Sequence, residues 1–291
     1  MTWFAYAVLS AFFAALSSIL EKKTLQRLHT IDFSTSLAFA AAVITLPTLF
    51  TASWDNISLT VLAAIFLVSL LAAIAFMEVT RGVRHLEISS SGPLFLMSPM
   101  ITALLGFVFL KEHLTDYEIL GMLLLLLGTY ILETRHFFHA GEFFANLFGD
   151  KYARVIMGGL LIYGFTSIGD RIILAYWEVE PLLYVALAQI FIALIFLLFT
   201  LVRNGSLVPA FSIFKTNWKS IVLVAILTSA YRFMQAEATA LAAVGLVVAI
   251  KRSSTLFTTL IGGELFHDHG LLRKTIACLI MIIGVCFIAL K

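Results

Sequence analysis

Hydrophobic residues run along this chain in long segments that are separated by short polar connections. A helix needs about 20 predominantly apolar residues to cross the hydrocarbon core of a bilayer. The pattern predicts ten such helices, at residues 3–24, 31–52, 58–80, 87–110, 117–133, 153–177, 181–202, 219–241, 244–265 and 271–290. We therefore expect an all-α integral membrane protein with ten transmembrane helices.

The composition agrees with a membrane protein. The 291 residues are 61% hydrophobic and 12% charged, whereas soluble domains carry about 25% charged residues. The net charge is only +2 and no long basic run occurs, so we expect no nucleic-acid partner. The first segment lacks the positive start and the cleavage site of a signal peptide, and we expect it to remain as a span. The predicted location is a cell membrane, plasma or inner, with lipid around a multi-pass protein.

A long connection between the fifth and sixth helices divides the chain into two sets of five. It covers residues 134–152, where aromatic and charged residues alternate as in an interfacial segment. We expect a first five-helix repeat over residues 1–133, this linker, and a second five-helix repeat over residues 153–291.

Internal similarity supports the division into repeats. Residues 16–22 (LSSILEK) match residues 165–171 (FTSIGDR), and residues 94–112 align without gaps to residues 246–264. Because five is odd, the second set must enter the membrane from the opposite side. The prediction is an inverted-topology repeat, which is frequent in secondary transporters and places the binding site between the halves.

Short motifs recur in the fourth and fifth helices of each set. They are Pro93, Pro99, Leu110-Lys111-Glu112 and Gly128 in the first half, with Gly263-Glu264 and Gly284 in the second. With the ten-helix arrangement, they make the chain resemble the EamA-type members of the drug/metabolite transporter (DMT) superfamily. The resemblance covers essentially the whole chain and implies a secondary transporter or exporter of small organic solutes that works by alternating access. The chain departs from the pattern at Lys251, which stands where the first repeat has Pro99.

Six charged residues lie well within the predicted spans. Four are basic (Arg171, Arg232, Lys251 and Arg252) and two are acidic (Asp170 and Glu237). Charged groups in a span are costly unless they face a protein interior or a water-filled cavity. The excess of cations predicts a site for a solute with an anionic group, such as an anionic metabolite. A structural network of ion pairs is the alternative interpretation.

Polar and aromatic neighbours extend this candidate site. Arg232 and Gln235 are three residues apart, as are Lys251 and Ser254, so each pair shares a helix face. Aromatic contacts are expected from Tyr163 and Tyr231. The predicted substrate-binding residues are Lys251, Arg252, Arg232, Gln235, Glu237, Arg171, Asp170, Tyr163, Tyr231 and Ser254, and the candidate proton carriers are Glu78 and Glu237.

Other chemical signals are weak. We expect no metal site, because the spaced residues His136, His139, His267, Asp268 and His269 lie in connections without further ligands. No nucleotide-binding or hydrolase motif occurs, so we expect no cofactor and no enzymatic activity. A membrane-embedded lipid-modifying enzyme and a non-transporting assembly subunit remain the alternatives, and the chain is expected to be a monomer or a homodimer.

The two indications of membrane orientation disagree. With the four cations deep within the spans left out, the connections 1–2, 3–4, 5–6, 7–8 and 9–10 and the helix ends beside them carry thirteen Lys and Arg residues, and the opposite face carries Lys111 and Lys291. The positive-inside rule then places both termini outside the cytoplasm. The family resemblance implies that both termini lie inside.

Overall fold

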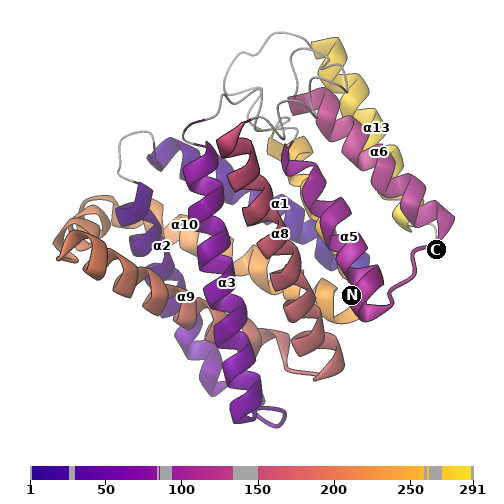
Figure 1. Cartoon of the computed structure of the whole chain (residues 1–291). Coiled ribbons are helices and arrows are strands. Elements are labelled where there is room, and N and C mark those ends of the chain that lie inside the picture. The colour runs from indigo at the N-terminus through magenta and orange to yellow at the C-terminus, as the bar shows by residue number, and fades with distance from the viewer. Residues whose placement is uncertain are drawn as a thin grey trace. The chain divides into compact units, whose positions relative to one another are not determined.

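The chain is all-helical in a computed structural model that describes residues 2–25, 30–83, 85, 94–133, 150–258, 261 and 271–289. These residues contain ten α-helices and two short helices of other types, and no strand (Figure 1). The α-helices are α1 (Trp3–Leu25), α2 (Thr30–Thr45), α3 (Leu59–Val83), α5 (Met97–Leu110), α6 (Asp116–Glu133), α8 (Lys151–Arg171), α9 (Pro181–Asn204), α10 (Val208–Leu241), α11 (Val244–Arg252) and α13 (Leu271–Ala289). The short helices are the 3-10 helix η1 (Leu46–Phe50) and the π-helix η2 (Ile172–Tyr176).

The described helices include six that are long and apolar enough to cross a membrane. They cover Trp3–Glu21, Ile31–Phe50, Leu59–Val83, Lys151–Tyr176, Pro181–Asn204 and Val208–Leu241. Two more apolar helices, Met97–Leu110 and Thr275–Ala289, are shorter. The protein is therefore a multi-pass membrane protein, as the hydrophobic pattern predicts.

The predicted ninth helix, residues 244–265, is interrupted. Helix α11 ends at Arg252, and Ser253 forms a turn before a second helical segment at residues 254–258. The Ser253 hydroxyl donates to the Ile250 carbonyl at 2.6 Å. Serine side chains offer the backbone such an alternative to the helical ladder, which explains why an apolar run breaks at this residue.

The predicted connection 203–218 is largely helical. Its residues from Val208 onward form the start of α10, which has a kink at Asn217 (φ −118°, ψ 23°). The Asn217 side chain donates to the Ile213 carbonyl one turn earlier, at 3.3 Å. A side chain inserted into the hydrogen-bond ladder is a recognised cause of a helix kink.

The chain forms two compact units, and each takes segments from both halves of the sequence. Unit 1 consists of Met1–Ala73 and Gly169–Leu241, and unit 2 consists of Ile74–Ile168 and Ala242–Lys291. The boundaries fall inside α3, inside α8 and in the connection between α10 and α11.

Polar side chains join α2 to α9 in unit 1. The Asn204 amide donates to Asp32 Oδ1 at 3.2 Å, and the hydroxyls of Thr35 and Thr200 are 2.7 Å apart. Later residues of α2 meet earlier residues of α9, so the two helices run antiparallel.

Helices α1 and α10 also pack antiparallel in unit 1. The Ser10 hydroxyl donates to the Tyr231 carbonyl at 3.0 Å, and the hydroxyls of Ser17 and Thr228 are 3.0 Å apart. Hydroxyl pairs of this kind satisfy polar groups between helices where lipid offers no partner.

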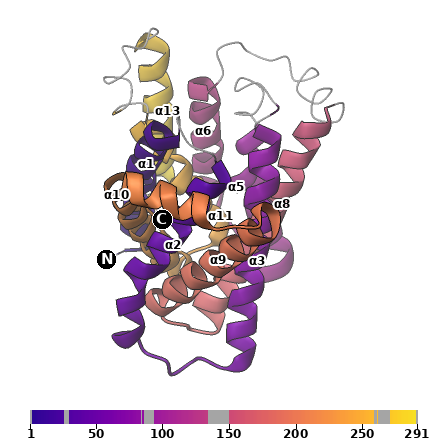
Figure 2. The ribbon, with the colours of Figure 1, turned by 90° about the vertical axis from the view of Figure 1, so that its left-hand side faces the viewer.

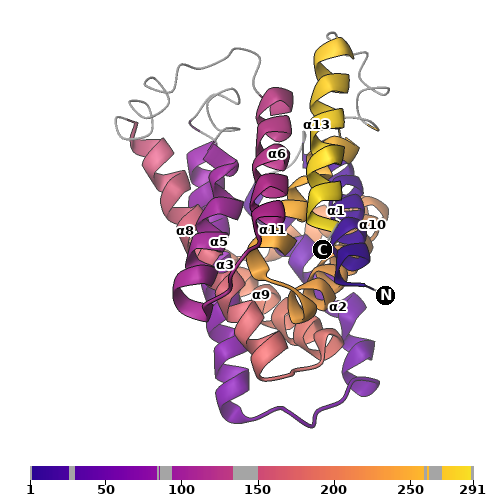
Figure 3. The same cartoon turned by 90° about the vertical axis from the view of Figure 1, so that its right-hand side faces the viewer.

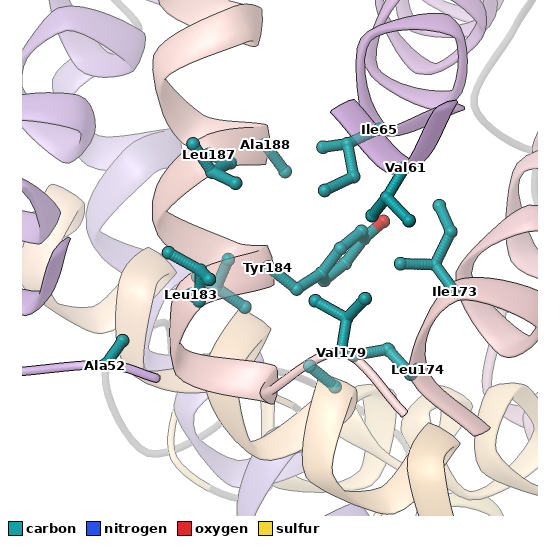
Figure 4. Close-up of a cluster of buried hydrophobic side chains, with 12 residues drawn as sticks. Ala52, Val61, Ile65, Ile173, Leu174, Val179, Leu183, Tyr184, Leu187 and Ala188 are labelled. Atoms are coloured by element: carbon teal, nitrogen blue, oxygen red, sulfur yellow. The ribbon is translucent and has the colours of Figure 1, made fainter. Parts of the chain in front are cut away.

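The apolar core of unit 1 surrounds the start of α9. The ring of Tyr184 lies among side chains that include Val61 of α3, Ile173 of η2 and Val179 (Figure 4). The loop from η1 to α3, at the bottom of Figures 2 and 3, is hydrogen-bonded to the loop before α9. The Ser53 N–H donates to the Glu180 carboxylate and the Asn56 amide to the Glu178 carbonyl.

Unit 2 contains a close antiparallel pair of helices, α6 and α13, which lie side by side in Figures 1 and 3. Gly121 faces Gly284 and Gly128 faces Met281; a Cβ on Gly128 would lie 2.8 Å from the Ala277 carbonyl oxygen. Both helices carry glycines, and the small size of each glycine lets the two backbones approach closely.

Helices α5 and α11 form the second antiparallel pair of unit 2. A Cβ on Gly245 would lie 2.7 Å from the Cβ of Ala103, and one on Gly106 would lie 3.4 Å from the side chain of Val244. Glycines thus bring α11 against α5 at the start of α11.

Helices α3 and α8 meet in both units. A Cβ on Gly169 would lie 2.5 Å from the Val68 side chain in unit 1, and one on Gly159 would lie 2.7 Å from the Val79 side chain in unit 2. The order of these contacts shows that α3 and α8 run antiparallel.

Candidate functional site

The structure distributes the candidate residues over the two units. Unit 1 holds six of them at the end of α8 and in the second half of α10: Asp170, Arg171, Tyr231, Arg232, Gln235 and Glu237. Unit 2 holds the other five, from α3, α8, α11 and the segment after α11: Glu78, Tyr163, Lys251, Arg252 and Ser254.

Asp170 and Arg232 come together around Tyr184 in unit 1. The Tyr184 hydroxyl donates to Asp170 Oδ1, and Tyr184 also interacts electrostatically with the Arg232 guanidinium. Tyr184 is buried in the apolar core (Figure 4), whereas Asp170 and Arg232 are half-buried. Helices α8, α9 and α10 thus each contribute one polar group to a common region.

Arg171 is bound to the end of α10. Its Nη1 donates to the Thr239 carbonyl at 2.5 Å. Thr239 is in the last turn of α10, where carbonyl groups have no partner within the helix and a cation is favoured. Directly after Arg171 the α-helix becomes the π-helix η2, a local widening that is frequent near functional sites.

The remaining unit 1 candidates lie along α10. Tyr231, Gln235 and Glu237 are half-buried, and the Tyr231 carbonyl accepts the hydrogen bond from Ser10. Glu237 is close enough to Glu180 for the two carboxylates to interact.

Lys251 and Arg252 form the last turn of α11 in unit 2. The negative end of the helix dipole favours cations at this position. The guanidinium carbon of Arg252 lies 5.7 Å from the centre of the Phe95 ring, within the range of a cation–π contact. The backbone and an aromatic ring therefore accommodate two charges inside an apolar segment.

Tyr163 belongs to the same part of unit 2. It packs with Phe95 against the buried side chains Leu94, Ala153, Ile156 and Leu160. Ser254 follows the turn at Ser253, is half-buried, and accepts a hydrogen bond from Thr258 through its carbonyl. Glu78 is half-buried near the end of α3.

Residues 1–134 match the EamA-like transporter family. The matched residues are the first part of the chain, a little less than half of it. In this part the chain is similar to a family of transporters, which points to a membrane transporter of small solutes. A search of curated proteins found no match.

A solved crystal structure of a protein is similar to almost the whole of this chain. The similarity covers 99% of this chain and 95% of the other, with a TM-score of 0.72 and 14% sequence identity. This likeness concerns the fold.

Sequence reasoning missed two contributors to these sites. Tyr184 binds Asp170, and Phe95 contacts Arg252. Tyr184 is a polar group within the apolar segment Pro181–Asn204, and this was the signal available in the sequence. Nothing in the sequence marks Phe95 among 26 phenylalanines.

Some residues that the sequence analysis named lie outside the described residues. They are His136, His139, His267, Asp268, His269, Pro93, Gly263 and Glu264. Within the described part of the chain, no group of three His, Cys, Asp or Glu side chains is placed to hold a metal ion.

Proposed function

We propose that this protein is a secondary transporter that exports a small organic solute with an anionic group. The family match supports the transport of a small solute. The position of Arg232 supports the proposal that the solute has an anionic group. Arg232 is a half-buried cation within the apolar helix α10 and lies beside the buried Tyr184. A charge at such a position is costly and is kept mainly where it meets a partner, a solute or a water-filled path.

The proposed substrate-binding residues have different tasks. Arg232, Lys251 and Arg252 supply positive charge, and Gln235 and Ser254 supply hydrogen bonds. The aromatic rings of Tyr163 and Tyr231 supply flat contact surfaces. The remaining members of the proposed set, Arg171, Asp170 and Glu237, balance the charge of the site and hold its helices.

The packing of the helices supports two inverted repeats and alternating access. Helices with the same place in the two five-helix sets pack as antiparallel pairs. These pairs are the second helices (α2 with α9), the fourth (α5 with α11) and the fifth (α6 with α13). The first helix of each set packs on the third of the other, as α1 with α10 and α8 with α3. Such reciprocal pairs are expected when a twofold axis in the membrane plane relates two halves.

We propose Glu78 and Glu237 as proton carriers for this transport. Glu237 is half-buried within the apolar helix α10, and Glu78 is half-buried near the end of α3. Carboxyl groups within spans are rare, and they often belong to proton paths. The variants Glu237→Gln and Glu78→Gln distinguish which of the two glutamates carries the proton. We expect transport to lose its dependence on a proton gradient when the carrier is replaced.

Purified protein in proteoliposomes tests the function. A thermal-shift screen against phosphorylated metabolites, amino acids and amphiphilic drugs first identifies a stabilising class, since a ligand stabilises the state that it binds. Transport of that class is then measured for wild type, Arg232→Ala and Lys251→Ala, with the exposed Arg203 changed to Ala as a matched control.

We expect the first two variants to lose transport while they elute as folded protein, and the control to transport normally. Wild-type rates in both Arg232→Ala and Lys251→Ala would contradict the site assignment. Stabilisation by cationic amphiphiles alone would contradict the anionic substrate.

A further inference from the structure

The short connection from α10 to α11 is held by a charged side chain on each side. Helix α10 ends at Leu241 and α11 begins at Val244, so only Ala242 and Ala243 join them. The boundary between units 1 and 2 falls between Leu241 and Ala242. The carbonyls of the last turn of α10 and the N–H groups of the first turn of α11 have no partners within their own helices.

Glu112 holds the start of α11 in unit 2. Its Oε2 accepts the Val244 N–H at 3.0 Å, and its own N–H donates to the Gly106 carbonyl at 3.2 Å. Lys111 has the left-handed backbone (φ 56°) that turns the chain at this point. A Cβ on Gly106 would lie 2.9 Å from Glu112 Oε2, so the glycine leaves the space that the carboxylate occupies.

Arg171 holds the end of α10 in unit 1 through the Thr239 carbonyl. The two contacts match the helix dipoles, since a carboxylate lies at a helix N-terminus and a guanidinium lies at a helix C-terminus. Each contact is made inside one compact unit, that of Arg171 in unit 1 and that of Glu112 in unit 2.

Helix α11 transmits the position of its first residue to its last. It has nine residues and spans about 12 Å at the usual rise of 1.5 Å per residue. Lys251 and Arg252 are in its last turn, and most of the residues before them are buried. Any shift of Val244 therefore moves both cations.

We propose that Glu112 is a positioning residue that clamps the start of α11 and thereby sets the place of Lys251 and Arg252 within unit 2. Glu112 acts through α11, and the contact of Arg171 holds the end of α10 in unit 1. The proposal rests on the proposed function, because the two cations matter as part of the solute site.

The contacts are tested by amide hydrogen exchange on the full chain in detergent micelles. The variants are Glu112→Ala, Glu112→Gln and Arg171→Ala. The matched control is Glu118→Ala. Glu118 is six residues after Glu112 and also caps a helix N-terminus, that of α6.

We expect Glu112→Ala to speed exchange at the start of α11 roughly fivefold, the usual effect of losing a cap, and Glu112→Gln to preserve most of the protection. Arg171→Ala should speed exchange in the last turn of α10 alone, and Glu118→Ala at the start of α6 alone. Unchanged exchange in α11 for Glu112→Ala, with a clear effect of Glu118→Ala on α6, would overturn the clamp.

Transport kinetics then separate positioning from general stability. We expect Glu112→Ala to raise the KM for the solute several-fold at a nearly constant maximal rate, with partial rescue in Glu112→Gln, while Glu118→Ala leaves the KM unchanged. A lower maximal rate with an unchanged KM would mean that Glu112 only stabilises the fold. If the wild type transports no solute class, the proposed function fails, and the exchange experiment still decides whether the clamp exists.

Discussion

Gly121 of α6 and Gly284 of α13 lie with their backbones in direct contact. A Cβ on Gly121 would lie 2.6 Å from the Gly284 carbonyl oxygen, and one on Gly284 would lie 2.7 Å from the Gly121 carbonyl oxygen. Backbone atoms cannot move aside as a flexible side chain can. The pair is therefore a point at which α6 and α13 tolerate no added volume.

Replacing Gly284 by leucine should separate α6 from α13. We expect a loss of about 1–3 kcal/mol of stability or more, because overpacking forces shifts of the backbone. Thermal unfolding followed by size-exclusion chromatography measures it. Gly158→Leu is the control, since nothing lies within 4 Å of a Cβ at Gly158. An equal loss in both variants would argue against the close contact.

Replacing Tyr184 by phenylalanine removes the hydroxyl that binds Asp170. We expect a loss of about 1–3 kcal/mol of stability, because a half-buried carboxylate loses a donor. Chemical or thermal unfolding of Tyr184→Phe, Asp170→Asn and the double variant gives the coupling between the residues. Tyr117→Phe is the control, because that hydroxyl belongs to an exposed ring stacked on Phe287. Strictly additive effects of the two substitutions would contradict the hydrogen bond.

Replacing Phe95 by leucine removes the ring that faces Arg252 but keeps an apolar side chain of similar size. We expect a stability loss of about 0.5–2 kcal/mol, the range of partly desolvated cation–π contacts. Lys219 and Trp218 form an exposed contact of the same kind, with 5.8 Å from the ammonium to the ring centre. Trp218→Leu should therefore cost less than Phe95→Leu in the same unfolding assay, and the reverse order would refute the prediction.

Thr115 and Glu118 form a reciprocal cap at the start of α6. The Glu118 carboxylate accepts the Thr115 N–H at 2.7 Å, and the Thr115 hydroxyl accepts the Glu118 N–H at 3.4 Å. Thr115→Ala and Glu118→Ala should each cost about 1 kcal/mol. The double variant should cost less than the sum of the two, because each residue needs the other. Unfolding curves of the three variants provide the measurement.

Hydropathy predicted the helices well, because a spanning helix needs about 20 consecutive apolar residues and such a run is visible in the local sequence. The predicted spans 219–241 and 271–290 correspond to helices that end at Leu241 and Ala289. The break at Ser253 was not predicted, because a serine side chain in an apolar run either keeps or interrupts the helix. The hydrogen bond from Ser253 to Ile250 decides between these outcomes.

The charged members of the candidate site could be named from the sequence, one residue at a time. Asp170, Arg171 and Arg232 stood out because ionisable groups are rare in apolar spans. Their partners were not predictable, since Tyr184 and Thr239 reach them from other helices through the fold. Glu112 was noted as part of a motif, but its contact with Val244 links residues 132 positions apart.

The interleaving of the two units constrains how the protein is made. Helices α1 and α2 enter the membrane long before α9 and α10, the helices that later cover Ser17 and Asp32. A fragment that ends before Gly169 therefore contains neither complete unit, and each unit can pack fully only after segments from both halves of the sequence are present.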